Sequence, residues 1–197
     1  MRRRSPVLWI VLGVVVILLF WGCGQQRSLA TADTAVQQSW SNVETNYQRR
    51  TDLYNSVVKT IQGSANFEKG TLTDVINARA KATSVQVNLD DSASLAQYQQ
   101  AQTQLQGSFS RLMAVAEAYP DLKTTQAFQN FQTQIEGTEN RINTARRDYN
   151  ATVNNYNLKV RLFPNNIFAG ILGYHQRAFY KADPGSEKAP DINFDIK

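Results

Sequence analysis

The sequence predicts an all-α protein: an antiparallel four-helix bundle with long first and last helices, preceded by an N-terminal transmembrane helix. Three observations support this fold class. Large apolar residues recur at steps of seven over long stretches, which is typical of helices that pack along a seam. The chain of 197 residues contains only 5 prolines and 10 glycines, too few for a sandwich of short strands joined by turns. An uncharged apolar run lies close to the N-terminus.

The N-terminal segment predicts a membrane anchor. Residues 1–6 form a basic flank that contains Arg2, Arg3 and Arg4, and no charged residue occurs in residues 7–23. At about 1.5 Å per residue this second segment is roughly 26 Å long, the lower end of what crosses a bilayer. Arginine is enriched on the cytoplasmic side of membrane spans. The flank therefore predicts a single-pass membrane protein, with its N-terminus in the cytoplasm and the bundle outside it.

Two other interpretations of this segment remain open. Cys23 follows Gly22, as in an acylation site, so the segment could be a lipoprotein signal, although Phe20 and Trp21 are bulkier than such signals favour. A signal peptide cleaved near Ala30 or Ala32 is the third interpretation. The simplest role for Cys23 is that of a small apolar residue at a helix end.

The predicted bundle occupies residues 25–180 and begins with a long helix over residues 25–63. Its seam has a seven-residue spacing, at Asp33, Trp40, Tyr47, Tyr54 and Ile61. A shorter helix is expected over residues 66–84, followed by an extended connector over residues 85–89. Asp91 and its neighbours are suited to cap a third helix that ends near Ala118, because the residue before Pro120 avoids the helical region.

The fourth helix has the most regular pattern in the chain. Its seam repeats every seven residues without interruption, at Phe128, Ile135, Ile142, Tyr149, Tyr156 and Phe163. Pro164 ends it, and Asn165 or Asn166 is expected to cap a short helix that runs through Ile171. Residues 181–197 are polar and are expected to form a loosely ordered tail. Short connections between helices that each carry an apolar seam favour the antiparallel bundle.

The composition argues against several functional classes. The formal net charge is +5, but it falls to +2 without the N-terminal arginines, so a nucleic-acid partner is not expected. One Cys and one His exclude a disulfide framework and a multi-ligand Cys/His metal site. None of the common catalytic motifs is present. We therefore expect no catalytic residue, no cofactor, no metal and no enzymatic activity, and the sequence sets no oligomeric state.

One polar cluster along the helix seams predicts a site. It consists of Arg49, Arg50, Glu136, Glu139, Asn140 and Arg141. A buried polar contact fixes the register of packed helices. We therefore predict a structural lock in which Glu136 or Glu139 pairs with Arg49 or Arg50, while Asn150 and Asn157 tie adjacent helices. A partner site built from the same residues and contact of the arginines with lipid phosphates are the alternatives.

Six ordered motifs carry a resemblance to a known family. They are NYQRRTDL at 46–53, YPDLK at 119–123, TENRI at 138–142, AR with YN at 145–150, YN at 156–157 and FPN at 163–165. In these motifs the chain resembles the LemA family of bacterial membrane-anchored helical proteins, over about residues 40–179. It departs from that family at Tyr54 and Asn55, where Ile-Pro is usual. The resemblance implies an N-terminal segment in the bacterial cytoplasmic (inner) membrane and an antiparallel four-helix bundle, and it carries over no catalytic residue.

These observations together predict a non-catalytic, single-pass membrane-anchored helical bundle that acts as an interaction or scaffolding module in the bacterial envelope. Its partners would be the lipid bilayer and an envelope or membrane protein. Lipid-surface binding or membrane shaping, using the Arg2–Arg4 flank and the overhanging first helix, is the alternative, and an enzyme with an unrecognised site is the third. Gln102 is expected to lie exposed on the third helix, where a label would report the side of the membrane.

Overall fold

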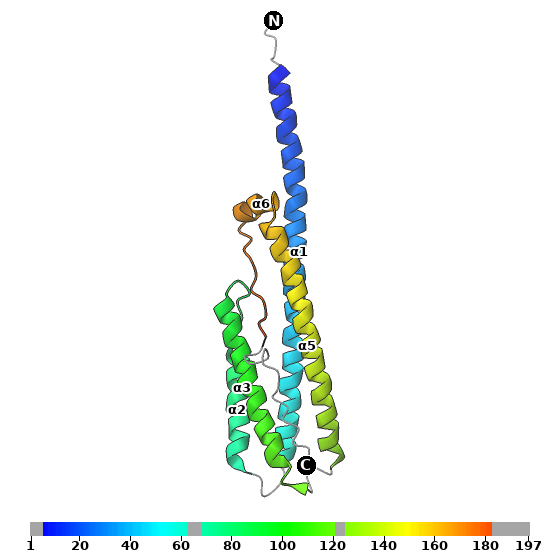
Figure 1. Cartoon of the computed structure of the whole chain (residues 1–197), viewed down its shortest axis with the longest axis vertical. Coiled ribbons are helices and arrows are strands. Elements are labelled where there is room, and N and C mark those ends of the chain that lie inside the picture. The colour runs from blue at the N-terminus through cyan, green and yellow to red at the C-terminus, as the bar shows by residue number, and fades with distance from the viewer. Residues whose placement is uncertain (1–5, 63–67, 121–124, 183–197) are drawn as a thin grey trace, which may run out of the picture.

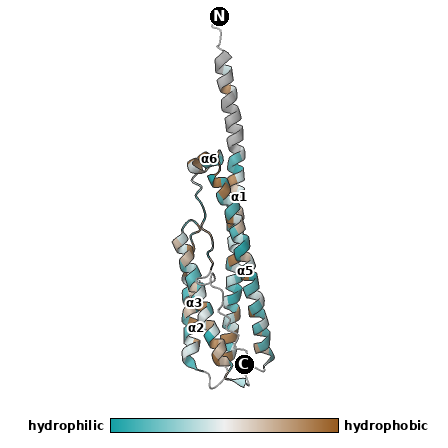
Figure 2. Ribbon diagram, viewed as in Figure 1, coloured by the Kyte–Doolittle hydropathy of each residue, from teal (hydrophilic) through white to brown (hydrophobic). Residues whose placement is uncertain are grey.

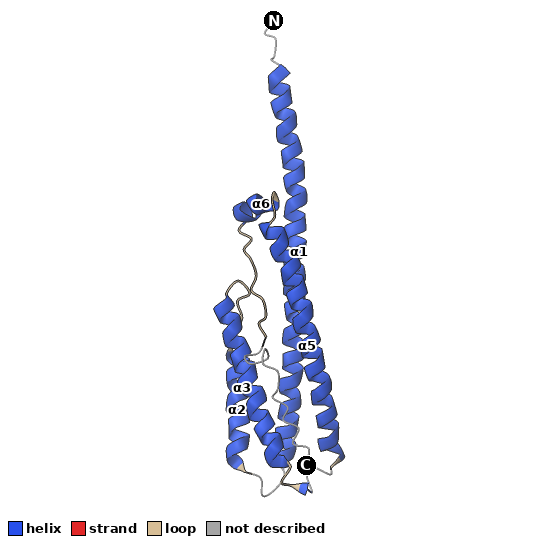
Figure 3. Ribbon diagram, viewed as in Figure 1, coloured by secondary structure: helices blue, strands red, loops and turns tan. Residues whose placement is uncertain are grey.

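The computed structural model describes residues 6–62, 68–120 and 125–182, with the side chains of residues 6–8, 10, 11 and 14–23 outside that description. Within these ranges the chain forms five helices and no strand (Figures 1 and 3). The all-α class is thereby confirmed. The helices are α1 (Pro6–Gln62), α2 (Lys69–Ser84), α3 (Ser92–Ala116), α5 (Gln126–Arg161) and α6 (Asn165–Leu172).

α1 is one continuous helix of 57 residues that joins the apolar N-terminal segment to the first predicted helix of the bundle. At 1.5 Å per residue it is roughly 86 Å long. Its first part extends well beyond the other helices (Figure 1). In the part of the chain that the structure describes, no helix contains a run long and apolar enough to cross a membrane. A spanning helix over residues 7–23 therefore stays a prediction.

The remainder of α1 packs along α5, and the predicted seam forms the core. Trp40, Tyr47, Tyr54 and Ile61 are all buried, as their seven-residue spacing requires. The Trp40 ring makes edge-to-face contacts with the rings of Tyr98 and Tyr149, whose centroids lie 5.5 and 5.3 Å away. Such aromatic pairs stabilise a core beyond the area they bury. Aromatic side chains from α1, α3 and α5 therefore fill the upper core, the cluster of buried residues nearer α6, whereas the lower core is the cluster nearer the end of α1.

α2 and α3 form a second helix pair beside the first (Figure 1). Asp91 caps α3, since its carboxylate accepts a 2.8 Å hydrogen bond from the Ala93 backbone N–H. The expected connector over residues 85–89 is neither helix nor strand, begins extended at Val85 and ends in a turn at Leu89, and its apolar side chains pack against the upper core. In the lower core, the rings of Tyr54 and Phe109 stack with centroids 3.6 Å apart. This stack joins the two helix pairs.

The C-terminal part of the chain differs from its prediction at α6. No side chain caps this helix, whose N-cap is Pro164. Asn165 is already its first residue, so it does not occupy the N-cap position from which an amide side chain bonds the first turn. Gly173 ends α6 at a φ of 75°, a conformation that favours glycine. The chain then returns as an extended segment along the body, by which we mean α2, α3, α5 and the part of α1 that packs along α5 (Figure 1). We call this segment, residues 174–182, the strap. Residues 183–197 of the expected tail lie outside the described residues.

Candidate functional site

Arg50 lies at the centre of a buried polar network. Its side chain is only 2% exposed, on the face of α1 that looks into the core. The guanidinium donates to Gln102 Oε1 at 2.7 Å and to the Gln102 backbone carbonyl at 3.2 Å, both on α3. It also donates to Glu139 Oε1 on α5 at 3.2 Å. One side chain therefore links three helices.

Two tyrosines enclose this network. The Arg50 guanidinium lies over the Tyr47 ring, 4.7 Å from its centroid, and 5.8 Å from that of Tyr54. Burial raises the pKa of Tyr54 well above its usual range, while the nearby Arg50 charge lowers it and Glu139 raises it. The Tyr54 hydroxyl therefore stays neutral at physiological pH. Arg50 Nε has no hydrogen-bond partner within the described residues.

The sequence predicts that Glu136 or Glu139 pairs with Arg49 or Arg50, and in the structure the pair is Arg50 with Glu139. The side chains of Arg49, Glu136, Asn140 and Arg141 are exposed. Gln102, expected to be exposed, is buried, because its side chain and carbonyl face inward to accept from the Arg50 guanidinium. Cys23 lies within α1, and its side chain is outside the described part of the chain.

A second polar network binds the strap to α5. The Asn157 amide donates to the Arg177 carbonyl at 2.9 Å and accepts from the Arg177 N–H at 2.8 Å. Asn150 makes the same pair of bonds with Tyr180, both at 2.8 Å. Seven residues of helix, from Asn150 to Asn157, rise by about 10.5 Å, and three residues of extended chain, from Arg177 to Tyr180, span about 10 Å. The spacing of the two amides along α5 therefore matches the spacing of the two strap residues that they bind. The prediction that these asparagines tie adjacent helices is wrong, because each clamps the strap backbone.

Arg177 anchors the strap through its side chain. Its guanidinium donates to Asp33 Oδ1 at 2.6 and 3.2 Å and also to Asp90. Burial lowers the pKa of Arg177, but the hydrogen bond and charge of Asp33, with the charge of Asp90, outweigh it and raise that pKa. No pattern in the sequence marks this residue. The available signal was Asp33, a carboxylate in an apolar seam, which needs a cation if it is buried.

Further contacts fasten the strap along its length. The Tyr149 hydroxyl donates to the Ala178 carbonyl at 2.8 Å, and the Ala178 N–H donates to the Leu89 carbonyl at 2.9 Å. The Tyr180 hydroxyl is hydrogen-bonded to that of Tyr47 in the core. The strap therefore fills the space between α5 and the connector that precedes α3.

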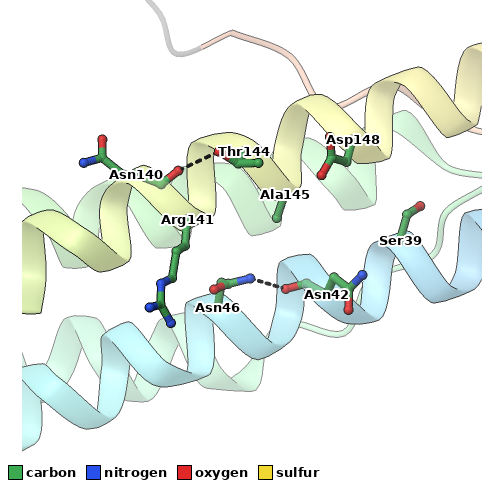
Figure 4. Close-up of a pocket in the computed structure, with 8 residues that line it drawn as sticks. All are labelled: Ser39, Asn42, Asn46, Asn140, Arg141, Thr144, Ala145 and Asp148. Atoms are coloured by element: carbon green, nitrogen blue, oxygen red, sulfur yellow. Dashed lines mark hydrogen bonds between the residues drawn. The ribbon is translucent and has the colours of Figure 1, made fainter.

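A shallow polar groove runs between α1 and α5 on the outer side of this pair (Figure 4). It has a volume of about 450 Å³ and contains two of the predicted site residues, Asn140 and Arg141. Figure 4 shows the Arg141 side chain extending from α5 toward Asn46 on α1. The Asn46 amide already donates to the Asn42 carbonyl at 2.7 Å. The lining of this α1–α5 groove is polar and open to solvent, which suits weak contacts more than a buried ligand.

A groove of different character lies between α3 and α5, at the end of the body away from α6. It has a volume of about 570 Å³. Its apolar lining is Tyr54, Phe109, Met113 and Ile135, and its acidic lining is Glu117, Glu136 and Glu139. This α3–α5 groove therefore joins an apolar floor to a cluster of carboxylates directly beside the Arg50 network. It can accept an apolar side chain together with a basic one.

Comparison with known proteins matches most of the chain to one family. The LemA family model matches residues 39–194, a range that holds Arg50, the α3–α5 groove and the strap. The chain is 25% identical over 206 residues to Magnetosome protein MamQ 2 of Paramagnetospirillum magneticum, covering 93% of this chain and 76% of that relative. It is 25% identical over 176 residues to Protein LemA of Metamycoplasma hominis, covering 89% and 77%. Magnetosome protein MamQ of Magnetospirillum gryphiswaldense is 23% identical over 206 residues, with 93% and 76% covered.

Proposed function

We propose that this chain, which belongs to the LemA family, is a non-catalytic, single-pass membrane-anchored helical bundle that presents an interaction surface in the bacterial envelope. The observation that carries this proposal is the continuity of α1 from Pro6 to Gln62. A continuous helix contains no flexible linker, so an anchor over residues 7–23 would hold the body at a fixed height above the bilayer. The names of the relatives state no enzymatic activity, which agrees with a binding function.

The body suits presentation because its helices are cross-linked by polar contacts. We regard α1, α2, α3 and α5 as one antiparallel four-helix bundle, in which successive helices run in opposite directions (Figure 1). Arg50 links three of them, and the stacked rings of Tyr54 and Phe109 join the two pairs. A surface supported in this way is preorganised, so a partner that binds it has less ordering entropy to lose.

The α3–α5 groove is the surface that we propose for the partner. Its apolar floor and its carboxylates favour a protein segment that carries apolar side chains next to Lys or Arg. Glu136 is exposed there, so it remains available to a cation, whereas Glu139 is already paired with Arg50. The groove lies at the end of the body opposite the proposed anchor, where an envelope protein has access to it.

Thiol labelling in intact spheroplasts tests the anchor and its orientation. In a Cys23→Ser background, Gln97→Cys places a thiol at an exposed position on α3. We expect it to react with a membrane-impermeant reagent before lysis, and the protein to resist carbonate extraction. Ser5→Cys, in the basic flank, is the matched control and should react only after lysis. Labelling at both positions only after lysis would overturn the orientation, and release by carbonate would overturn the anchor.

Site-specific photo-crosslinking in native membranes tests the partner surface. A photoreactive residue at Gln132 lies in the α3–α5 groove, and one at exposed Gln129 lies on α5 outside that groove. We expect one dominant protein adduct from position 132 that is absent from position 129. The Glu136→Lys variant should weaken this adduct, because it repels a basic partner segment. Equal adducts at both positions, or no change with Glu136→Lys, would refute this surface.

A further inference from the structure

The end of the body nearest the N-terminal part of α1 carries an exposed apolar surface. Ten large hydrophobic side chains are exposed among the described residues, and six of these lie between residues 158 and 172. α6 is attached through its inward side, where Ala169 is buried and Phe168 packs against the upper core. Its outward side carries Ile167 and Ile171, which are 53% and 76% exposed. Apolar surface gathered in this way marks a contact with another apolar phase.

We define the end surface as Leu162, Phe163, Ile167 and Ile171. Its place along α1 is set by a hydrogen bond from Lys159 Nζ to Ser28 Oγ of 3.2 Å. The end of α5 is therefore level with a residue only five positions after Cys23. Five residues of helix rise about 8 Å, close to the roughly 5–8 Å depth of one headgroup layer. α6 packs against α1 and α5 across this end of the body (Figure 1), and Figure 2 shows hydrophobic residues on it.

The charges around the end surface suit a lipid headgroup region. No Asp or Glu occurs between Tyr149 and Ala182, while Lys159 and Arg161 immediately precede the surface. Arg161 is exposed. Exposed apolar side chains bordered by basic residues are typical of helices that lie in the membrane interface. A protein partner would be equally compatible with the apolar side chains alone, but the position beside the uncharged residues 7–23 favours the bilayer.

We propose that the end surface inserts into the boundary between the headgroups and the acyl chains of the bilayer. This inference rests on the proposed anchor and adds a second membrane contact to it. Interfacial helices bury their apolar face by about 5–10 Å into this boundary. With both contacts made, the body cannot rotate freely about α1 and is seated on the membrane. The α3–α5 groove then faces away from the bilayer.

Depth-dependent quenching in the full-length protein, reconstituted in phosphatidylcholine vesicles, tests this contact. In a Cys23→Ser background, single cysteines at Leu12, Ile171 and Ile76 carry an environment-sensitive fluorophore. Leu12 reports the anchor, Ile171 the end surface, and Ile76 is a matched exposed isoleucine on α2, away from that end. Lipids bearing a quencher near the headgroup or near the chain end then locate each probe. Circular dichroism checks that each labelled variant keeps its helical content.

We expect the Ile171 probe to be blue-shifted and quenched more by the shallow quencher than by the deep one. The Leu12 probe should show the opposite order, and the Ile76 probe should be quenched by neither. Quenching at Leu12 alone would overturn the inference and leave the proposed anchor standing. Quenching at neither Leu12 nor Ile171 would refute both. Equal quenching at Ile171 and Ile76 would indicate non-specific adsorption and also overturn the inference.

Discussion

Arg50 and Arg177 are both paired with carboxylates, but they stabilise different parts of the molecule. The side chain of Arg50 is 2% exposed and connects three helices whose packing the apolar seams already determine. The side chain of Arg177 is 16% exposed and fixes a segment that is neither helix nor strand. The first therefore reinforces a register that exists without it, whereas the second determines where its segment lies.

This contrast separates global from local stability. Removing a partner from a network buried among helices affects the unfolding of the whole body. Removing a contact of the strap affects first the opening of residues 174–182, because hydrogen bonds to individual side chains, and not a helical ladder, hold its backbone at Arg177 and Tyr180. The two arginines should therefore be distinguishable by which measurement responds to their substitution.

The largest effect is expected from Glu139→Gln. It removes the carboxylate but leaves the Arg50 charge buried, and an unpaired buried charge costs about 3 kcal/mol or more. We expect the free energy of unfolding, measured by denaturant titration of the protein in detergent, to fall by about this amount. Arg50→Met should cost less, about 1–2 kcal/mol, since the buried charge is then absent and mainly Gln102 loses a donor.

The double variant and the exposed neighbours sharpen this prediction. If Arg50 and Glu139 act as one unit, the loss in the double variant is smaller than the sum of the two single losses by about 0.5–3 kcal/mol. Arg49→Met and Glu136→Gln, at exposed positions, should change stability by no more than about 0.5 kcal/mol. Strict additivity of the Arg50 and Glu139 losses would mean that the two side chains do not stabilise the fold as a pair. The pair would then not differ in coupling from exposed residues.

A smaller and more local effect is expected from Arg177→Ala. The guanidinium loses Asp33 and Asp90, and hydrogen bonds to charged groups contribute about 1.5–3 kcal/mol. Hydrogen exchange at the Ala178 and Tyr180 amides should accelerate by roughly 10- to 100-fold, by the usual 1.4 kcal/mol per factor of ten. Helical amides in the middle of α1 should change less. An equal loss of protection in α1 would show that the strap and the helices unfold together.

The asparagine clamps provide the next comparison. Asn157→Ala and Asn150→Ala each remove two hydrogen bonds to the strap backbone, worth about 1–2 kcal/mol per clamp. Exchange at the amides of Arg177 and Tyr180, respectively, should accelerate, with little change in global unfolding. Asn154→Ala, at an exposed position of the same helix, is the control and should leave both amides protected. If it accelerates exchange equally, the clamps do not hold the strap.

How well the sequence predicted each network follows from the same contrast. The seven-residue seams predicted the helices and placed Glu139 near Arg50, because helical periodicity fixes which residues face a neighbouring helix. The strap has no period, so its path depends on individual side-chain contacts between residues that are 20 positions apart, as Asn157 and Arg177 are, or as many as 144, as Asp33 and Arg177 are. The prediction that Gln102 is exposed is wrong because an amide side chain is usually at the surface. Its burial depends on the Arg50 guanidinium of another helix, which the pattern around Gln102 does not indicate.

The smallest effect at neutral pH, and the clearest pH dependence, is expected from Tyr149, which joins the strap to the core. Burial raises its pKa to about 12, although the charge of Arg177 opposes this. A raised folded-state pKa means that the neutral phenol favours the folded state. Its contribution is complete below the ordinary value of 10.0 and is lost as the pH rises toward 12. Stability should therefore fall across this alkaline range.

Tyr149→Phe tests this assignment. The variant lacks the hydrogen bond to the Ala178 carbonyl, so at pH 7 it should be less stable by about 1 kcal/mol. It also has no proton to lose, so its stability should fall less steeply than that of the wild type between pH 10 and pH 12. Denaturant titrations at several alkaline pH values measure this slope. An unchanged slope would assign the alkaline loss to other groups, and Tyr149 would then hold the strap only through its neutral hydrogen bond.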